Sequence, residues 1–374
     1  MKNSEWNDYQ SSACAKQPYR RTPGGARNNV GLPAVVDGEV FGLCRLSDLL
    51  GVKSDGVVEE ILRNSLFAPT SALTANHGKR VRGQLVNLAY RLVLGDGPAS
   101  LQAARQCRIA AEVVELIHAG SLIVDDIEDG SEQRRGQPAV HVQYGTPLAL
   151  NAGNWLYFWP SELLKDSHLP KDRLQLAYER YHRTLVRAHF GQAIDLGTKV
   201  HYLPQAAVAE VTLASIKLKT GALSGFAALL GGVVAGVSET VVNVLDDFGV
   251  DLGVALQMFD DLGNVIGKCD PLKRFEDLSL SRPSWVWACA AEHSDAQSYE
   301  SFLGAVACLP DPTLAEKWLH CHGILEAGRA SAKENLEQAF RRLERRLAAC
   351  GVGWSARAFA ELRQLGDSIA VAYG

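Results

Sequence analysis

Carboxylate side chains gather in two short stretches of this 374-residue chain. The first, SLIVDDIEDG, sets Asp125 and Asp129 four residues apart behind an apolar run. On a helix, that spacing places both carboxylates on one face, about one turn apart. A solvated helix end is one interpretation. The apolar residues before it favour a buried helix, in which unpartnered carboxylates are costly, so we expect a hard divalent cation such as Mg2+.

The second stretch, LQMFDDLGNV, repeats the pattern. Asp260 and Asp261 follow another apolar helical run, and Asn264 lies four residues after Asp260. Two such helices could face each other across a cavity, hold several Mg2+ ions and leave coordination positions open. Magnesium commonly fills such positions with substrate phosphates. The two stretches together therefore indicate a substrate that carries phosphate.

Cationic side chains are needed as well, because metal ions alone would leave part of a diphosphate's charge uncompensated. Three basic runs could provide them: HGKRVRG, the pair Arg134 and Arg135, and KLKTG, in which Lys219 precedes Thr220. Arginine forks match phosphate oxygens two at a time. One such run would usually be a solvated face. Two acidic and three basic stretches in one apolar helical chain favour a diphosphate site.

The elements that must position these groups are helices. Apolar residues recur at three- and four-residue spacing, and β-branched runs flanked by turn residues are scarce. We expect an all-α fold with long helices over residues 104–129, 171–197, 205–236, 239–266 and 325–348. Residues 1–38 are polar and weakly periodic and predict a disordered extension. Residues 39–374 show no break in composition and predict one large domain.

Composition narrows the classes of function and the compartment. A net charge of −4 and a pI near 6.2 do not suit a nucleic-acid-binding protein. The eight cysteines are scattered without a CxxC pair, which predicts free thiols in a reducing cytoplasm. No apolar run reaches the roughly 18 residues that a membrane span needs. The Gly- and Ala-rich segment 221–237 is expected to be a core helix.

At these residues the chain resembles a known family, the trans-prenyl diphosphate synthases, which make farnesyl, geranylgeranyl and longer diphosphates. The resemblance covers about residues 75–350. GKRVRG resembles the family's GKxxR element, and SLIVDDIEDGSEQRRGQPAVHVQYG resembles its first aspartate-rich motif with the arginine pair. ALNAGN, GQAIDL, KTG and LQMFDDLGN follow in the family's order.

The resemblance implies one large helical bundle of the isoprenoid synthase type, usually a homodimer, with the two acidic motifs facing each other across a central cavity. By this analogy the direct Mg2+ ligands are Asp125, Asp129 and Asp260. Asp126, Asp261 and Asn264 would act from a second layer or through water. The family pattern further implies three Mg2+ ions with the bound diphosphate.

The resemblance also assigns residues to two substrates. Those implied for the allylic diphosphate are Arg134, Lys219 and Gln257, with Thr220 near the developing cation. Those implied for isopentenyl diphosphate are Lys79, Arg82, His118 and Arg135. Lys273 and Arg282 match late basic positions that close over the diphosphate. His118 by itself would be taken for a core histidine, but it lies two turns before Asp125 on nearly the same face, where the family has His or Gln.

The implied reaction is a head-to-tail condensation. Magnesium and the cationic side chains would stabilise the charge on the departing diphosphate. The double bond of isopentenyl diphosphate, held close, would then attack the allylic carbocation. A proton would leave to the released diphosphate, and an apolar cavity would exclude the water that quenches the cation.

The chain departs from the family pattern at several positions. Asn264 replaces the usual last aspartate of the second motif, as in geranylgeranyl synthases of the eukaryotic type. Arg282 stands where lysine is commoner, and Gly83 replaces a frequent proline. Trp285 and Trp287 are bulkier than the residues that the family usually has there.

Product length in this family depends on residues just before the first motif. Here they are Gly120 and Ser121, both small, whereas farnesyl synthases often have an aromatic residue in this region. Small residues leave room for a longer prenyl chain, so we expect geranylgeranyl diphosphate rather than a farnesyl or longer product. The aromatic residues of NWLYFWP either wall the cavity or belong to the ordinary core.

Two other functions remain open from the sequence. A class I terpene cyclase on the same scaffold would suit the altered second motif, and its tryptophans could stabilise carbocations by cation–π contact. A cyclase would not need the isopentenyl diphosphate residues. A non-catalytic partner subunit is the other alternative, and the intact acidic motifs argue against it.

Overall fold

The computed structural model describes residues 56–74, 80–95, 97, 99–267 and 273–373. The extension expected over residues 1–38, the first residues of the expected domain and Lys79 lie outside the described residues. The expected all-α fold is confirmed for the part described. Its helices are α2 (Gly56–Leu62), η1 (Arg63–Phe67), α3 (Ala68–Thr74), α4 (Val81–Leu94), α5 (Leu101–Glu128), α6 (Val140–Tyr144), α7 (Thr146–Trp155), α8 (Trp159–Lys165), α9 (Lys171–Gly197), η2 (Val200–Tyr202), α10 (Gln205–Ile216), η3 (Lys217–Gly221), α11 (Ala222–Ala235), α12 (Glu239–Ile266), α13 (Glu276–Ser279), α14 (Trp285–Glu292), α15 (Ala296–Val306), α16 (Thr313–Cys321), α17 (Ile324–Ala349) and α18 (Ala356–Tyr373).

The long helices lie where the apolar spacing predicts them. The helices expected over residues 171–197 and 239–266 are α9 and α12, with the same bounds. Those expected over 104–129 and 325–348 are α5 and α17, which differ from the prediction by at most three residues at either end. Among the described residues, the strands are two short ones that pair antiparallel, β1 (Gln133–Arg134) and β2 (Gln137–Pro138).

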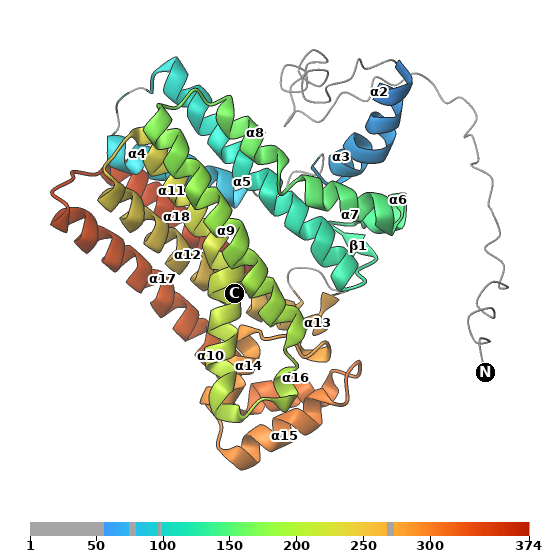
Figure 1. The fold of residues 1–374 in the computed structure, drawn as a ribbon. Coiled ribbons are helices and arrows are strands. Elements are labelled where there is room, and N and C mark those ends of the chain that lie inside the picture. The colour runs from blue at the N-terminus through green and yellow to red at the C-terminus, as the bar shows by residue number, and fades with distance from the viewer. Residues whose placement is uncertain (1–55, 75–79, 96, 98, 268–272, 374) are drawn as a thin grey trace, which may run out of the picture.

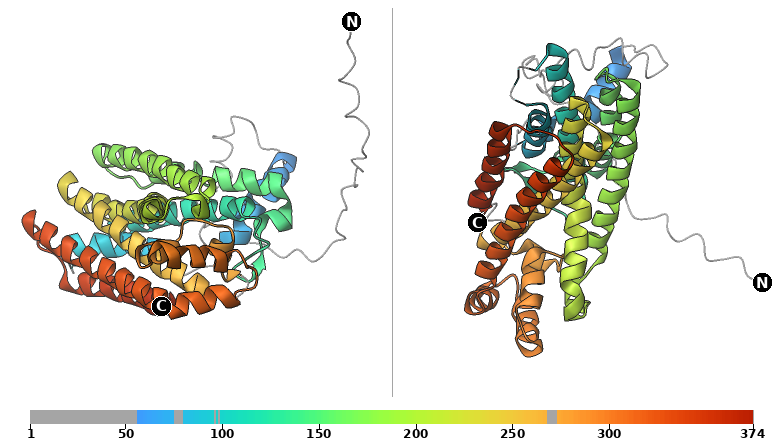
Figure 2. Two further views of the ribbon diagram at one scale, coloured as in Figure 1. Left: turned by 90° about the horizontal axis from the view of Figure 1, so that it is seen from below. Right: turned by 90° about the vertical axis from the view of Figure 1, so that its left-hand side faces the viewer.

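The centre of the bundle is α11, which packs against α4, α9 and α12, while α12 in turn packs against α17. Figure 2 shows α17 and α18, in red, on one side of α12 and the green helix α9 on the other. All residues of α11 from Ala222 to Val234 are buried. A Cβ atom at Gly231 would lie 2.5 Å from the carbonyl oxygen of Val86, so glycine there allows close contact between α11 and α4.

The helical run Gln205–Ala235 contains an 18-residue window that is apolar enough to cross a membrane. The sequence analysis expected no apolar run of that length. That part of the prediction is corrected. However, 78% of this apolar window is buried inside the protein, as expected for a core helix. Burial against helices on several sides explains the composition without a lipid environment.

A π-helical turn, η3, interrupts this run between α10 and α11 and contains Lys219 and Thr220. Such turns are frequent at functional sites because they redirect side chains within an otherwise regular helix. A Cβ atom at Gly191 of α9 would overlap the backbone nitrogen of Lys219, so this glycine lets α9 approach the turn closely. The π-turn therefore places Lys219 directly against the end of α9.

The C-terminal ends of α5 and α9 converge with the C-terminal part of α12 beside α13 (Figure 1). Hydrogen bonds join them: Gln192 of α9 binds Asp125 of α5, and Arg282 binds both Asp129 and the Asp195 carbonyl oxygen. Helix C-termini carry partial negative charge, so three helix C-termini with carboxylates nearby favour the binding of cations.

Candidate functional site

The first acidic motif occupies the last turn of α5 and its C-cap, Asp129. Each of its aspartates lies against a different cationic side chain. Lys219 Nζ is 3.2 Å from Asp125 Oδ1, and Arg282 Nη2 donates to Asp129 Oδ1 at 2.7 Å. The third is buried Asp126, whose carboxylate accepts from Arg134 Nε at 2.9 and 3.1 Å and also from Nη2. The protein thus provides its own counter-charges for this motif.

Arg134 lies in the segment that follows the motif and binds Asp126 of the motif. The Asp126 carboxylate and burial act in opposite directions on it, and the pKa of Arg134 is raised on balance. Its contacts with Asp126 use two of its three nitrogens, and a guanidinium has five N–H donors. An anion could therefore still bind on its remaining edge, as the sequence predicts for the allylic diphosphate.

Two residues of α9 complete this side of the site, and the sequence analysis assigned neither of them a role. Gln192 Nε2 donates to Asp125 Oδ1 and Glu128 Oε2, both at 2.6 Å. Asp195 Oδ2 accepts from Lys219 Nζ at 3.0 Å. Burial opposes the charge of Lys219, but Asp125 and Asp195 together raise its pKa, so the ammonium stays charged. The only signal in the sequence was the family element GQAIDL.

The second acidic motif lies on α12, and its buried aspartate, Asp261, has neutral hydrogen-bond partners. Asp261 is 5% exposed and accepts hydrogen bonds from the Trp285 backbone nitrogen at 2.6 Å and from Gln257 Nε2 at 2.8 Å. Burial, followed by the charge of Asp277, raises its pKa well above the usual range. The half-buried Asp260 lies 3.4 Å from the same Gln257 amide, whose Oε1 accepts from Thr220 at 2.8 Å.

Asn264 connects the two motifs through the segment after α12. Its Nδ2 donates to the Lys273 carbonyl oxygen at 2.8 Å, and Lys273 Nζ donates at 2.8 Å to Ser131, two residues after the first motif. Glu276 lies 3.6 Å from the same ammonium. A carboxylate at position 264 could not donate to a carbonyl, so the amide has a structural use that aspartate would lack.

A further carboxylate, Asp277 of α13, lies near the second motif and near Asp195 of α9. Burial and the charges of Asp195 and Asp260 raise its pKa to about 7. Burial and the neighbouring Asp125 also raise the pKa of Asp129, against the opposing charge of Arg282. Carboxylates from four elements therefore repel one another across this region, and a bound cation would relieve that repulsion. Asp277 follows the second motif by a short segment, and no spacing rule identified it from the sequence.

These donors suit magnesium better than a metal that is held by protein alone. Within the described residues, no group of three or more His, Cys, Asp or Glu side chains is close enough to hold an ion by itself. Asn264 Oδ1 is buried and has no hydrogen-bond partner there. Magnesium takes one or two carboxylates and completes its shell with water and substrate phosphates, so the residues present fit it. Asp125, Asp129 and Asp260 remain its predicted direct ligands.

Of the predicted isopentenyl diphosphate residues that the structure describes, Arg82 and Arg135 act electrostatically on His118. Burial, followed by the guanidinium groups of Arg82, Arg135 and Arg134, lowers its pKa well below the usual value. The imidazole is therefore neutral at pH 7, beside a group of positive charges. The arginines come from the start of α4 and from the turn after α5, so the fold brings distant parts of the sequence together here.

The two residues predicted for the cavity floor, Gly120 and Ser121, have different surroundings. A Cβ atom at Gly120 would lie 2.8 Å from Leu156 Cβ and 2.9 Å from the Gly153 carbonyl oxygen. The space beside Gly120 is therefore filled by α7 and the residue that follows it, and the glycine serves helix packing. Ser121 is half-buried and donates to the His118 carbonyl oxygen at 2.8 Å. It remains the candidate for the product-length position.

The aromatic residues of NWLYFWP do not act as one wall. Trp155 stacks on the buried Trp159, with ring centroids 5.2 Å apart, as in an ordinary core. Phe158 is 70% exposed. Only Tyr157 faces the acidic motif: burial, followed by Asp125 and Glu128, raises its pKa.

The two unexpected tryptophans are core residues. Trp285 is 4% exposed, donates from Nε1 to the Gly328 carbonyl oxygen at 3.1 Å and binds Asp261 through its backbone. Trp287 is fully buried and packs edge-on against Phe302, at 5.0 Å between centroids. Their bulk is therefore explained by packing behind the second motif, and neither is needed to stabilise a carbocation.

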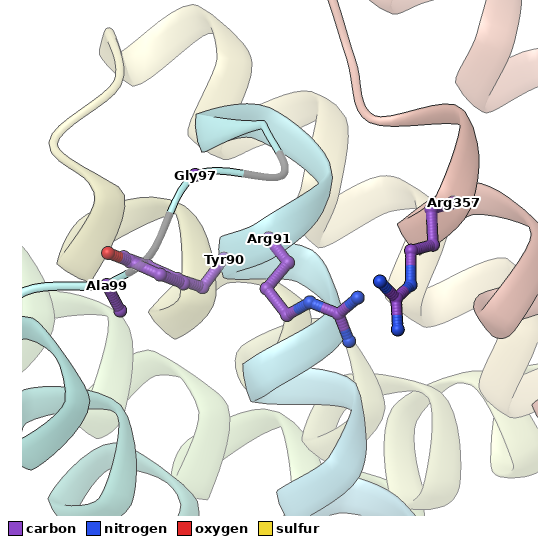
Figure 3. A pocket seen from close by; sticks show the side chains of 5 residues that line it. All are labelled: Tyr90, Arg91, Gly97, Ala99 and Arg357. Atoms are coloured by element: carbon purple, nitrogen blue, oxygen red, sulfur yellow. The ribbon is translucent and has the colours of Figure 1, made fainter.

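A surface pocket of about 310 Å³ lies at the far end of α4 from Arg82, lined by Tyr90, Arg91, Gly97, Ala99 and Arg357 (Figure 3). Figure 3 shows the guanidinium groups of Arg91 and Arg357 pointing toward each other. Glu361 binds both of them, Arg91 Nη1 at 2.5 Å and Arg357 Nε at 3.1 Å. This pocket contains none of the predicted site residues and is separate from the acidic motifs.

Comparison with known proteins supports one family. The sequence profile of the family described as polyprenyl synthetase matches residues 63–308. A short chain isoprenyl diphosphate synthase of Methanothermobacter thermautotrophicus is 29% identical over 295 residues, which cover 77% of this chain and 86% of that protein. A geranylfarnesyl diphosphate synthase of Aeropyrum pernix is 29% identical over 267 residues, covering 70% of this chain and 81% of the relative.

Solved structures have the same fold. A geranylgeranyl pyrophosphate synthase of Corynebacterium glutamicum, in complex with isoprenyl diphosphate and magnesium, superposes with a TM-score of 0.68 at 22% identity. The superposition covers 87% of this chain and 94% of that one.

Proposed function

This chain belongs to the polyprenyl synthetase family and is a trans-prenyl diphosphate synthase, and from that premise we propose that it condenses isopentenyl diphosphate with an allylic diphosphate to make geranylgeranyl diphosphate. The observation that carries the proposal is a pair of separate cationic surfaces. Lys219 and Arg282 bind acidic residues, whereas the charges of Arg82 and Arg135 act on His118. Two diphosphate substrates need two such surfaces.

The first surface would bind the allylic diphosphate. Lys219, Arg134 and Gln257 would contact it, with Lys273 and Arg282 closing over it. Asp125, Asp129 and Asp260 would hold magnesium, as the named ligand of the Corynebacterium structure supports, and we propose three ions. Bound magnesium would stabilise the charge on the departing diphosphate. Lys219 would do the same from the protein, since two carboxylates keep its ammonium charged.

The second surface would hold isopentenyl diphosphate. Arg82, Arg135 and the neutral His118, together with Lys79, would orient its diphosphate so that its double bond lies near the allylic carbon. Thr220 would lie beside the developing cation, where its hydroxyl already binds Gln257. The proton lost at the end of the condensation would pass to the released diphosphate.

The test is product analysis with purified protein and Mg2+. Farnesyl diphosphate should be extended to geranylgeranyl diphosphate only when isopentenyl diphosphate is present. A cyclic hydrocarbon from farnesyl diphosphate alone would indicate a terpene cyclase. The buried positions of Trp285 and Trp287 argue against that outcome. No turnover with geranyl, farnesyl or dimethylallyl diphosphate would indicate a non-catalytic subunit.

The names of the relatives range from short-chain to geranylfarnesyl synthases, so they do not decide the product length. The proposed length therefore depends on Ser121. We expect Ser121→Phe to shorten the product, since the phenylalanine ring would fill the space below the acidic motif. Gly120→Ala is the matched control: its Cβ would meet α7, so it should lower the melting temperature by a few degrees and leave the product unchanged. Geranylgeranyl diphosphate from Ser121→Phe would remove Ser121 from the floor.

We further propose a cytoplasmic homodimer. Large apolar side chains are exposed on and near α7 and α9, namely Leu150 (41%), Phe158 (70%) and Phe190 (62%). Contact between two copies would remove such residues from water. The cysteines of the described part are free, which suits a reducing compartment. Light scattering should show a particle of two chains.

A further inference from the structure

The start of α4 carries the basic element GKRVRG and has an unusual N-cap. Arg80 is the N-cap residue, with a left-handed backbone at φ 45° and ψ 41°, and its side chain makes no capping hydrogen bond. Residues other than glycine rarely adopt this conformation, and the first N–H groups of a helix need partners from elsewhere. Something outside α4 must therefore hold its first turn.

Two glutamates of α5 do so. Glu115 Oε1 accepts a hydrogen bond from the Gly83 backbone nitrogen at 2.7 Å, and Glu112 Oε1 accepts from Arg80 Nη2 at 2.6 Å. A carboxylate at a helix N-terminus is also favoured by the helix dipole. Glu115 thus caps α4 from a neighbouring helix, in place of the missing cap on Arg80.

The identity of residue 83 fits this arrangement. A Cβ atom there would lie 3.3 Å from Glu115 Oε1 and 3.4 Å from its Cγ, so the carboxylate packs directly on the glycine. Proline, which is frequent at this position in the family that the chain resembles, has no N–H to donate. The exchange of proline for glycine therefore creates the donor that Glu115 uses.

Glu112, Glu115 and His118 are spaced three residues apart on α5, so they follow one face of the helix. Arg82, which lies next to Gly83, is near His118, since its charge acts on that imidazole. The cap on Gly83 consequently fixes the backbone that carries Arg82 relative to the helix that carries His118.

We propose that Glu115 is a positioning residue for the isopentenyl diphosphate site, acting through the Gly83 N–H to hold Arg82 against His118. The proposal rests on the proposed function, because it assumes that these residues bind isopentenyl diphosphate. Its effect should fall on that substrate, since Lys219 and the second acidic motif lie on other elements and the first motif lies at the C-terminal end of α5, away from Glu115.

The first test compares Glu115→Ala with Glu115→Gln. Calorimetry with isopentenyl diphosphate alone measures its Kd. The alanine variant should bind isopentenyl diphosphate about tenfold more weakly, because it loses one helix cap. The glutamine variant keeps a hydrogen-bond acceptor, so its Kd should stay within about threefold of the wild-type value. The KM for the allylic substrate and kcat should change little in both. Equal losses in the two variants, or an equal rise in both KM values, would overturn the capping role.

Ser100→Ala is the matched control for stability. Ser100 is the N-cap residue of α5 and accepts a hydrogen bond from the Ala103 nitrogen at 3.1 Å. The Ser100→Ala variant should lower the melting temperature about as much as Glu115→Ala without changing the Kd for isopentenyl diphosphate. A Kd that rises equally in Ser100→Ala would mean that general destabilisation, and not positioning, weakens binding.

A second pair of variants changes only the donor. Gly83→Ala keeps the N–H, and Gly83→Pro removes it in the first turn of a helix, where proline is tolerated. The proline variant should weaken isopentenyl diphosphate binding as Glu115→Ala does, and the double variant Gly83→Pro with Glu115→Ala should be no worse than either. Additive losses would refute a shared contact. If the wild type itself fails to bind isopentenyl diphosphate, the proposed function fails instead.

Discussion

The two acidic motifs look alike in sequence but are held in different ways. The first lies at the end of α5, where Lys219, Arg134 and Arg282 each bind one of its aspartates. In the second, Asp261 is bound by a backbone N–H and by the Gln257 amide. Carboxylates at the negative end of a helix need cations, whereas a buried carboxyl within α12 can be held by neutral donors. The same residue types thus meet different local fields.

The two sides of the site therefore contribute different charges. The first side brings both carboxylates and cations, so it can contact a metal ion and an anion at once. The second side contributes carboxylates and a brace, Asn264, which reaches the first side through Lys273 and Ser131.

The largest effect is expected from Asp125→Ala. This change removes a predicted magnesium ligand and one of the two carboxylates that bind Lys219, so kcat should fall by about 10² to 10³. Asp260→Ala should lose a similar factor, because Asp260 is the proposed magnesium ligand of the second motif. Steady-state assays, with the melting temperature as a folding control, measure this. Near-normal turnover in either variant would refute the metal role of that motif.

Lys219→Met should lower turnover by about a hundredfold. It leaves Asp125 and Asp195 without the ammonium that both contact at 3.2 and 3.0 Å. Lys217→Met is the control, because it lies on the same π-turn with an exposed side chain. If both lysine variants lose the same activity, the π-turn rather than the charge of Lys219 is responsible.

Asn264→Asp should lower activity about tenfold, even though it restores the residue that the family usually has. The new carboxylate cannot donate to the Lys273 carbonyl oxygen, so the brace is lost. The Mg2+ concentration for half-maximal rate should not fall. Higher activity at a lower Mg2+ concentration would show that position 264 acts chiefly as a metal ligand, and that the two motifs are more alike than their hydrogen bonds indicate.

The smallest effect concerns His118, on the helix of the first motif. Its pKa in the folded protein lies below the value of about 6.5 in the unfolded chain, so the unfolded state binds the proton first and stability is lost as pH falls below about 6.5. His118→Gln should remove this loss. Its melting temperature relative to the wild type should rise by a few degrees between pH 8 and pH 5.5. A constant difference across that range would contradict a depressed pKa.

Much of the fold and part of the site could be predicted from the sequence alone. The bounds of α9 and α12 follow from apolar spacing, and both acidic motifs follow from carboxylates at four-residue intervals. These features are local: helical periodicity decides which residues share a face, whatever the rest of the chain does. The family resemblance rested on the same short motifs.

Only the tertiary structure decided which groups meet across the chain. Gln192 and Asp195 of α9 contact Asp125 and Lys219. The charge of Asp260 acts on Asp277. No spacing rule encodes such contacts between distant segments. The structure also shows that a Cβ atom at Gly120 would meet Leu156 and the Gly153 carbonyl oxygen, a helix contact that the sequence does not reveal. Sequence periodicity determines the face on which a side chain lies, but the packing of other helices determines what that face meets.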